Sequence, residues 1–468
     1  MEAFEHDGVF WLPGKEDEQC AGRLKFDPAR DATLSLIGGF GSLLQQFSNQ
    51  RRIVRIHGTA GKRYLTLDGC FNTNTSFEMP GTTHQIFYVG QIIAGHLFDE
   101  GEGLTFDRCS VALDQLPAWI GRTGIRRLWP QEQSDPITIE IVRLDDESVQ
   151  VGDDELKVTT VSTFQGDDII STTVVQKTTL QITYPIPQPL EHIRDDVRHL
   201  QDLLTLATTT ASVLEEMVLW RSDITTEYRP GKHRPDAMAY YASQLAERVR
   251  LDDPQPARVL FKYQAIGGLA TIARWLTVAR QYHIVVASLL SIRYSTGLYA
   301  ENRFNNVIQA AESFHRLRFS NEVRPQAEFD QFAQELVDAV PEEHQKWLGK
   351  QLQYTNEPRL WQRLNEMTKH AGAAFSALYE KPGIWVQVAA NSRNRLTHHD
   401  KDQPVEFRPG DLYFIAESIF LLVMLCLFRE CGMDDTALAA IAESASAQFL
   451  RDKLAELVPR LHEQMKQA

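Results

Sequence analysis

Hydrophobic periodicity first changes close to residue 190 in this 468-residue chain. Before that point, short runs rich in Val, Ile, Thr, Phe and Tyr alternate with Gly, Asp and Asn turns, a pattern typical of β-strands. From about Leu269 onward, apolar residues recur every three or four positions, as they do on the buried faces of helices. The chain is therefore expected to be an α+β multidomain protein, in which a β-rich sandwich or barrel-like domain precedes an all-α helical bundle.

The first half carries several runs with strand character at fairly regular spacing. They include Thr33–Ile37, Arg52–His57, Tyr64–Leu67, Gln85–Val89, Thr138–Val142, Lys157–Phe164 and Thr172–Thr183. Three prolines between residues 185 and 189 then indicate a break, and an apolar stripe from Leu190 predicts a helix over about residues 190–213. A further strand is expected at Met217–Arg221. We expect domains at residues 1–265 and 266–468.

The second half consists of amphipathic or apolar segments separated mainly by Pro and Gly. The predicted helices are 269–293, 299–319, 326–339, 342–353, 358–379, 384–398, 411–431 and 434–464. The longest apolar run, Ile419–Phe428, has ten residues, about half of what a membrane span needs. We expect the apolar helix Phe414–Phe428, which contains this run, to lie in the core and to extend into a dimer interface. The acidic N-terminus lacks the features of a signal peptide, which favours a cytoplasmic protein.

Charge and cysteine content exclude some kinds of partner and cofactor. The formal net charge is -14, which argues against a broad basic face for nucleic acid, so any contact with RNA must be local. The five cysteines form no C-x-x-C pair and lie near no pair of histidines at zinc-site spacing. Reduced thiols are expected, and neither a metal nor another cofactor is.

An Arg followed five residues later by His occurs three times, at Arg52–His57, Arg194–His199 and Arg393–His398. The first match lies in a predicted strand, where a structural role is expected. The second flanks the apolar stripe of a regular helix, where a solvated surface is expected. The third ends a predicted bundle helix and precedes a polar loop. Only this third context favours a functional site.

The residue types at Arg393 and His398 suit metal-free RNA cleavage. An imidazole can exchange protons near neutral pH, and a guanidinium can stabilise charge on phosphate oxygens. The RNA 2′-OH then serves as nucleophile. Five residues along a regular helix separate two side chains by about 140° and about 7.5 Å. They converge only if the last turn opens or if the cleft forms between two copies. The alternative is a basic helix end that the helix dipole favours.

The sequence R-N-R-L-T-H at residues 393–398 resembles the R-N-x-x-x-H signature of HEPN ribonucleases. Proteins of that kind generally pair through a two-fold axis that brings two motifs together. The resemblance implies a metal-independent endoribonuclease with Arg393 and His398 as its catalytic pair. It also implies a 2′,3′-cyclic phosphate product and a homodimer formed through the HEPN domain.

A second resemblance covers roughly residues 5–260. The segments that carry it are Gly8–Gly14, Gly22–Phe26, Thr33–Gly38, Ile56–Gly58 and Tyr64–Leu67, with Gly90 and Gly95 beyond them. They are similar to the N-terminal domain of ApeA-type proteins. In the bundle, Glu301–Phe304 and Gln309–Arg316 resemble a helix that precedes the motif helix. This resemblance implies bacterial defence against phage by abortive infection, with tRNA as the expected RNA target and a phage-derived trigger.

Six further residues are candidates for supporting roles. They are Asn394, Glu312 and His399 beside the catalytic pair, and Arg395, Lys369 and His370 for RNA phosphate. Glu312 could orient Arg393 or His398 as a carboxylate partner. The alternative for Glu312 is a solvated charge, and the alternative for His399 is a surface position without a role in catalysis. His315 lies on the apolar face of its helix, where a buried, hydrogen-bonded histidine is expected.

Two other functions remain open on the sequence alone. The first is a non-catalytic binding or sensor protein that dimerises through its helical half. The second is a β-rich carbohydrate-active enzyme, for which Trp11, Trp119 and Trp129 are available but no paired carboxylates stand out. Under the nuclease hypothesis, the N-terminal domain is expected to act as a sensor that restrains the helical half.

Overall fold

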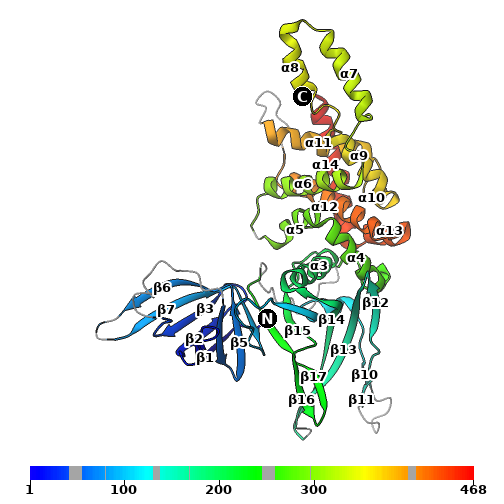
Figure 1. Cartoon of the computed structure of the whole chain (residues 1–468). Helices are drawn as coiled ribbons and strands as arrows, with labels where there is room; N and C mark the ends of the chain where they lie inside the picture. The colour runs from blue at the N-terminus through cyan, green and yellow to red at the C-terminus, as the bar shows by residue number, and fades with distance from the viewer. Residues whose placement is uncertain are drawn as a thin grey trace. The chain divides into compact units, whose positions relative to one another are not determined.

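The structure is a computed structural model of the chain (Figure 1). It describes residues 1–41, 55–77, 79, 81–129, 138–167, 169–244, 259–295, 297–398 and 407–467. Two compact units divide the chain. Unit 1 contains Met1–Leu204, Ala211–Pro254 and Gly267–Leu276, and unit 2 contains Thr205–Thr210, Gln255–Ile266 and Thr277–Ala468.

The largest element of the described part of unit 1 is an antiparallel sheet of 14 strands, in the order β12-β13-β14-β9-β15-β18-β8-β5-β4-β1-β2-β3-β7-β6. Its strands are β1 Phe4–Trp11, β2 Cys20–Phe26, β3 Ala32–Ile37, β4 Arg55–Ala60, β5 Arg63–Asp68, β6 Phe71–Phe77, β7 Thr83–Val89, β8 Gln91–Ala94, β9 Thr105–Leu113, β12 Glu147–Val151, β13 Asp154–Gly166, β14 Thr172–Pro189, β15 Leu214–Trp220 and β18 Met238–Tyr241. Two separate ribbons pair β10 Ile125–Leu128 with β11 Thr138–Ile141, and β16 Thr225–Arg229 with β17 Lys232–Pro235. The β-rich first half of the predicted fold class is confirmed.

Alternation of apolar and polar residues explains why β1 to β5, β7 and β8 enclose a core. In β7 the buried and partly exposed residues alternate strictly, and β2 and β3 follow the same period of two. Phe10, Leu24, Leu34 and Phe87 meet at the centre with 0% exposure. Trp11 and Trp119, the latter in the short helix α2 (Leu116–Ile120), are also buried, so neither forms an exposed platform for a sugar.

The helix α3 (Leu190–Thr208) supplies the apolar stripe that the sequence predicted, and Ile193, Val197 and Leu200 are buried. It ends five residues earlier than expected, because Thr209 adopts a left-handed conformation with φ 55. The carboxylate of Asp114 then accepts hydrogen bonds from the Val213 amide and the Ser212 hydroxyl. These bonds lead the chain into β15, which contains most of the strand expected at Met217–Arg221.

The proline-rich segment before α3 does not end the preceding strand, contrary to expectation. β14 continues through all three prolines to Pro189, with a register shift relative to β9 between Thr183 and Gln188. A bulge accommodates residues that lack an amide hydrogen, because it takes them out of the regular ladder. The helix still begins directly after Pro189, as the sequence indicated.

Helices make up most of the described part of unit 2 and confirm the all-α second half. The helices of this half are α4 Leu269–Gln281, α5 His283–Tyr294, α6 Ala300–Arg318, α7 Gln326–Asp338, α8 Glu342–Leu352, α9 Leu360–Ala371, α10 Ala373–Leu378, α11 Pro382–His398, α12 Asp411–Glu430, α13 Asp435–Ala442 and α14 Ala445–Gln467. Three predicted helices are each divided in two. The break between α9 and α10 falls at Gly372, whose φ of 64 interrupts a regular helix.

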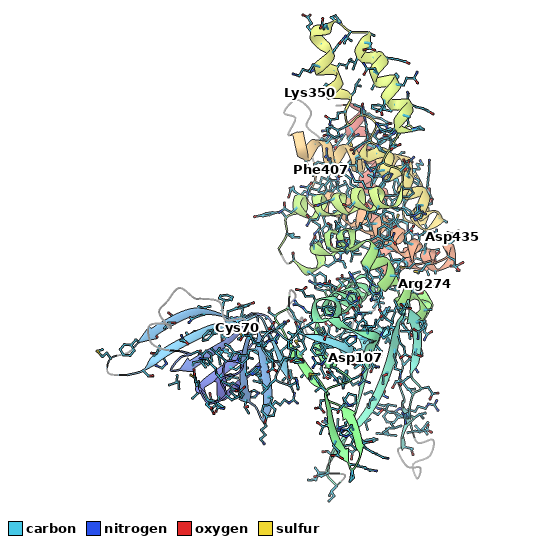
Figure 2. The ribbon with its side chains drawn as sticks, viewed as in Figure 1. Cys70, Asp107, Arg274, Lys350, Phe407 and Asp435 are labelled. Carbon is cyan, nitrogen blue, oxygen red and sulfur yellow. The ribbon has the colours of Figure 1, made fainter. Side chains whose placement is uncertain are left out.

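Unit 2 contains a buried core helix and a projecting hairpin. α12 is long and apolar enough to cross a membrane, but 83% of that stretch is buried, so it forms the core of the bundle. It packs against α6, α9 and α14. By contrast, α7 and α8 form a hairpin that projects from the bundle, and the exposed side chain of Lys350 lies on it (Figures 1 and 2).

Candidate functional site

The helix α11 carries the R-x-x-x-x-H motif, and its first half is fixed in the core. Pro382 occupies the first turn, where a missing amide hydrogen costs nothing. Trp385 has 0% exposure, and its Nε1 donates to Ser418 Oγ of α12 at 2.8 Å. Its ring also contacts Phe375 edge-on, with centroids 4.7 Å apart. These contacts fix the position of α11 relative to α12 and α10.

The second half of α11 turns from core to surface. Ser392 is fully buried, and its hydroxyl donates to the Val388 carbonyl at 2.8 Å. Arg393 and Arg395 are partly exposed, and Asn394 is exposed. The motif therefore lies where the helix leaves the bundle, with at least three polar side chains within reach of solvent.

The helix remains regular up to its last residue, His398. The backbone therefore does not open between Arg393 and His398, and a regular helix sets the two positions about 140° apart. Of the two ways to bring the pair together, opening of the last turn is not observed. The His398 side chain and the whole of His399 lie outside the described residues.

The other two matches to the same spacing belong to the β-rich unit. His57 is buried in β4, with Nε2 2.7 Å from the Phe98 carbonyl oxygen, and Arg52 lies outside the described residues. Arg194 is exposed, as expected for a solvated helix face. His199 is instead buried, and its carbonyl oxygen accepts a hydrogen bond from Trp275 of α4 at 2.7 Å. The expectation of a solvated His199 was wrong.

In α6, the predicted core face is confirmed, and His315 has 0% exposure. Arg363 Nη1 lies 2.9 Å from Nδ1 of this ring, and Glu366 Oε2 lies 2.8 Å from its Nε2. Burial lowers the pKa of His315, although Glu366 opposes the shift. Glu312 is partly buried on the same helix, and its charge acts on the Arg363 guanidinium.

His370 and Lys369 end α9, and they differ in their surroundings. Lys369 is exposed. His370 Nε2 lies 2.9 Å from Glu430 Oε1, which also accepts from Arg318 Nε at 2.7 Å. Burial lowers the pKa of His370, and Glu430 partly offsets this shift. A carboxylate thus occupies the position where a phosphate oxygen would need to approach this imidazole.

Sequence reasoning missed a further charged group, formed by Arg293, Arg303 and Glu417. Arg293 of α5 makes a two-pronged contact with Glu417 of α12, with Nη1–Oε1 at 2.9 Å and Nη2–Oε2 at 2.6 Å. Arg303 Nη1 lies 3.5 Å from the same carboxylate. The sequence contained a signal for this group, because Arg293 and Glu417 are isolated charges in two of the most apolar helices, and charges in such helices need a partner. In the part of the chain that the structure describes, no three His, Cys, Asp or Glu residues gather as a metal site.

Comparison with known proteins supports the resemblances. The family model for ApeA N-terminal domain 1 matches residues 5–275, more than half of the chain. The model for the Apea-like HEPN domain matches residues 305–437, a range that includes the motif at 393–398. No curated protein and no solved structure matches the chain. The chain therefore belongs to the ApeA-like family, with ApeA N-terminal domain 1 followed by an Apea-like HEPN domain.

Proposed function

We propose that this protein is an anti-phage endoribonuclease that acts by abortive infection, with Arg393 and His398 as its catalytic pair. The observation that carries the proposal is the position of the motif. It lies inside the segment matched by the Apea-like HEPN domain, on a helix that is anchored at Trp385 and leaves the bundle at Arg393. A rigid helix with a solvent-accessible end can present a cation and an imidazole to RNA.

The proposed chemistry needs neither a metal nor a protein nucleophile. The RNA 2′-OH attacks the adjacent phosphorus and loses its proton, and the 5′-oxygen of the next nucleotide leaves and gains a proton. The products are a 2′,3′-cyclic phosphate and a 5′-OH end. His398 moves the proton, and Arg393 stabilises the charge on the phosphate oxygens.

A second copy completes the site in this proposal. Because α11 remains helical through His398, the backbone positions of Arg393 and His398 lie about 140° apart around one helix. A two-fold axis near the ends of two α11 helices can set Arg393 of one copy beside His398 of the other. We therefore propose a homodimer formed through the helical half, with residues 266–468 as the nuclease domain.

The charge distribution suits a small contact with RNA. The net charge of the chain is -14, while α11 contains Arg393 and Arg395 and no Asp or Glu. We propose that Arg395 and Asn394 hold RNA phosphate and sugar beside the catalytic pair, with Lys369 as a further cation. His370 supports this role less well, because it contacts Glu430. A folded RNA with an exposed single-stranded loop, such as tRNA, is the proposed target.

The N-terminal domain, residues 1–265, is proposed to act as sensor and restraint. Uncontrolled RNA cleavage would kill the cell that makes it, and the catalytic chemistry proposed above uses no residue of the β-rich half. A phage-derived trigger would then release the helical half. Binding of the trigger by the β-rich half supplies the free energy for this change.

The decisive experiment is cleavage of labelled tRNA by the full chain in the presence of EDTA. The expected product ends are a 2′,3′-cyclic phosphate and a 5′-OH. His398→Ala and Arg393→Ala should each lower the rate by at least about 100-fold. Arg194→Ala is the matched control, because this exposed residue has the same spacing to a His, and it should retain full activity. Undiminished cleavage by both motif variants would exclude the pair from the chemistry.

A further inference from the structure

A cavity of about 520 Å³ lies in unit 2, and the chemistry proposed above leaves it unused. It is formed by α5, α12 and the first turns of α14, with contributions from two residues outside these helices. The lining residues are Thr209, Leu260, Arg293, Tyr413, Phe414, Glu417, Phe420, Leu421, Ala445, Ser446, Ala447, Phe449 and Leu450. None of them belongs to α11.

The charged part of the cavity is the contact between Arg293 and Glu417. The Arg293 side chain is only 12% exposed, and its Cζ lies over the Phe420 ring, 4.1 Å from the ring centroid. Both Nη atoms bond to Glu417, but within the described residues Nε has no hydrogen-bond partner. A buried guanidinium N–H without an acceptor is costly, and a ligand atom can supply one. Glu417 can accept further bonds, because a carboxylate has about four lone-pair positions.

The walls of the cavity are aromatic and partly open to solvent. Tyr413 is 40% exposed and Phe449 is 56% exposed, although both line the cavity. Phe414 lies between them, in edge-on contact with both rings. Thr209 also lines the cavity with φ 55, a conformation that a β-branched residue rarely adopts and that often marks a functional site.

These features define the shape and polarity of a ligand. It has flat apolar faces for the aromatic walls, an acceptor for Arg293 Nε, and a donor for Glu417 on one edge. An aliphatic ligand would leave the guanidinium unsatisfied, and a sugar would leave the rings poorly covered. Purine bases carry a ring or carbonyl acceptor beside an N–H donor. Arg303 and Lys453, whose Nζ lies 5.5 Å from the Phe449 ring, add positive charge near the cavity.

We propose that this cavity binds a purine base that carries a phosphate, held by Arg293 and Glu417 at its edge and by Phe449 on its face. The base can belong to a free nucleotide or to an unpaired position in RNA, and the same contacts serve both. The site is distinct from Arg393 and His398 and requires no catalysis.

Binding of AMP and GMP to the full chain, measured by calorimetry, tests the proposal, with ribose 5-phosphate as the probe without a base. The expected result is saturable binding of at least one purine nucleotide and none of ribose 5-phosphate. Phe449→Ala should weaken binding about tenfold or more, because a stacked base contributes on the order of 1–3 kcal/mol. Phe332→Ala, at a partly exposed phenylalanine of α7, is the matched control and should bind normally. No binding of either nucleotide, or equal binding by the two variants, overturns the proposal.

The source of the base is distinguished with the His398→Ala chain, which should leave RNA uncut. If a short single-stranded RNA with purines displaces the bound nucleotide and an all-pyrimidine RNA does not, the site binds a base of RNA. Nucleotide binding that neither RNA disturbs identifies a free nucleotide. Both outcomes support the site. If the chain binds purine nucleotides but never cleaves RNA, even after removal of its N-terminal domain, the nuclease proposal fails and this one stands.

Discussion

Arg363 donates a hydrogen bond from Nη1 to Nδ1 of His315 over 2.9 Å, and this contact fixes the state of a fully buried imidazole. A guanidinium has donors only, so Nδ1 must be the acceptor. The other ring nitrogen then carries the hydrogen and donates it to Glu366 Oε2 at 2.8 Å. The ring is therefore neutral, and it links α6 to α9 through both nitrogens.

A first prediction concerns stability at low pH. Burial lowers the pKa of His315, so the unfolded chain binds a proton more readily than the folded one. The free energy of unfolding should therefore fall as the pH drops below about 6.5, the ordinary pKa of histidine. His315→Gln keeps one donor and one acceptor but does not titrate. Between about pH 7.5 and 5.5, its Tm should fall less than that of the unchanged chain.

The charges around His315 set the control for this measurement. Glu366, Arg363 and Arg316 act on the ring and remain in the variant. The pKa of His370 is also lowered by burial, so part of the pH dependence should persist. Replacing the exposed His344 with Gln should leave the full drop in Tm. Equal drops in all three chains would contradict the account of His315.

A second prediction concerns the bond that anchors α11. Ser418→Ala removes the acceptor of Trp385 Nε1, and both side chains have 0% exposure. An unpaired buried N–H costs about 1–3 kcal/mol, and the free energy of unfolding should fall by this amount in chemical denaturation. Ser376→Ala, at an exposed serine of α10, should change it by less than about 0.5 kcal/mol. Similar stability of the two variants would show that the bond contributes little.

The spacing of apolar residues predicted those helices and strands that are buried on one face only. The helix expected over residues 299–319 is α6, and its apolar face contains Phe304, Ala311 and Phe314, because apolar residues at three- and four-residue steps can be buried only on one side of a helix. The fold class and most strands of the first half were predictable for the same reason. The exact ends were not, because a tertiary contact such as that of Asp114 with Val213 decides where α3 gives way to β15.

The parts that could not be predicted depend on partners distant in sequence. Arg293 and Glu417 are 124 residues apart, and nothing local to either residue identifies the other. His370 was expected to face RNA phosphate, but its contact with Glu430 depends on the packing of α9 against α12. The motif at Arg393 could be found from the sequence because both of its residues belong to one helix. In our proposal the complete active site also needs a second copy of the chain, which the sequence of one chain does not show.

A third prediction tests whether the active site is shared between two copies. Arg393→Ala and His398→Ala chains are each expected to be inactive, because every site in such a dimer lacks one group. In a mixed dimer, the intact Arg393 of one chain can meet the intact His398 of the other and form one complete site. Random mixing makes half of the dimers mixed, so about a quarter of the original activity should return.

The control for this mixing experiment is a chain that carries both substitutions. Mixed with either single variant, the double variant should restore no activity, because no pair of chains then supplies both groups at one site. Activity is followed by the release of a 2′,3′-cyclic phosphate end from labelled RNA. If the two single variants form mixed dimers and the mixture still shows no cleavage activity, both catalytic groups of a site belong to the same chain.

A fourth prediction concerns restraint by the β-rich half. A fragment that starts at Gln255 keeps Leu260 and Phe261, which cluster with unit 2 and are buried. Phe261 packs edge-on against Phe428 with ring centroids 5.0 Å apart, so a later start would expose the core helix α12. If the N-terminal domain restrains the nuclease, this fragment should cleave RNA at least about tenfold faster than the full chain without a trigger, because a restraint of more than about 1.4 kcal/mol is lost.

The fragment experiment needs evidence that the fragment folds, since it also lacks Thr205–Thr210 of unit 2. The amide of Leu260 donates to the Ala207 carbonyl at 2.8 Å in the full chain, and this bond is lost. Helical circular dichroism and a cooperative thermal transition are therefore required before activity is compared. His398→Ala in the same fragment should abolish the gain, which separates the nuclease from contaminants. A folded fragment that is no faster than the full chain would argue that the β-rich half binds a partner without restraining catalysis.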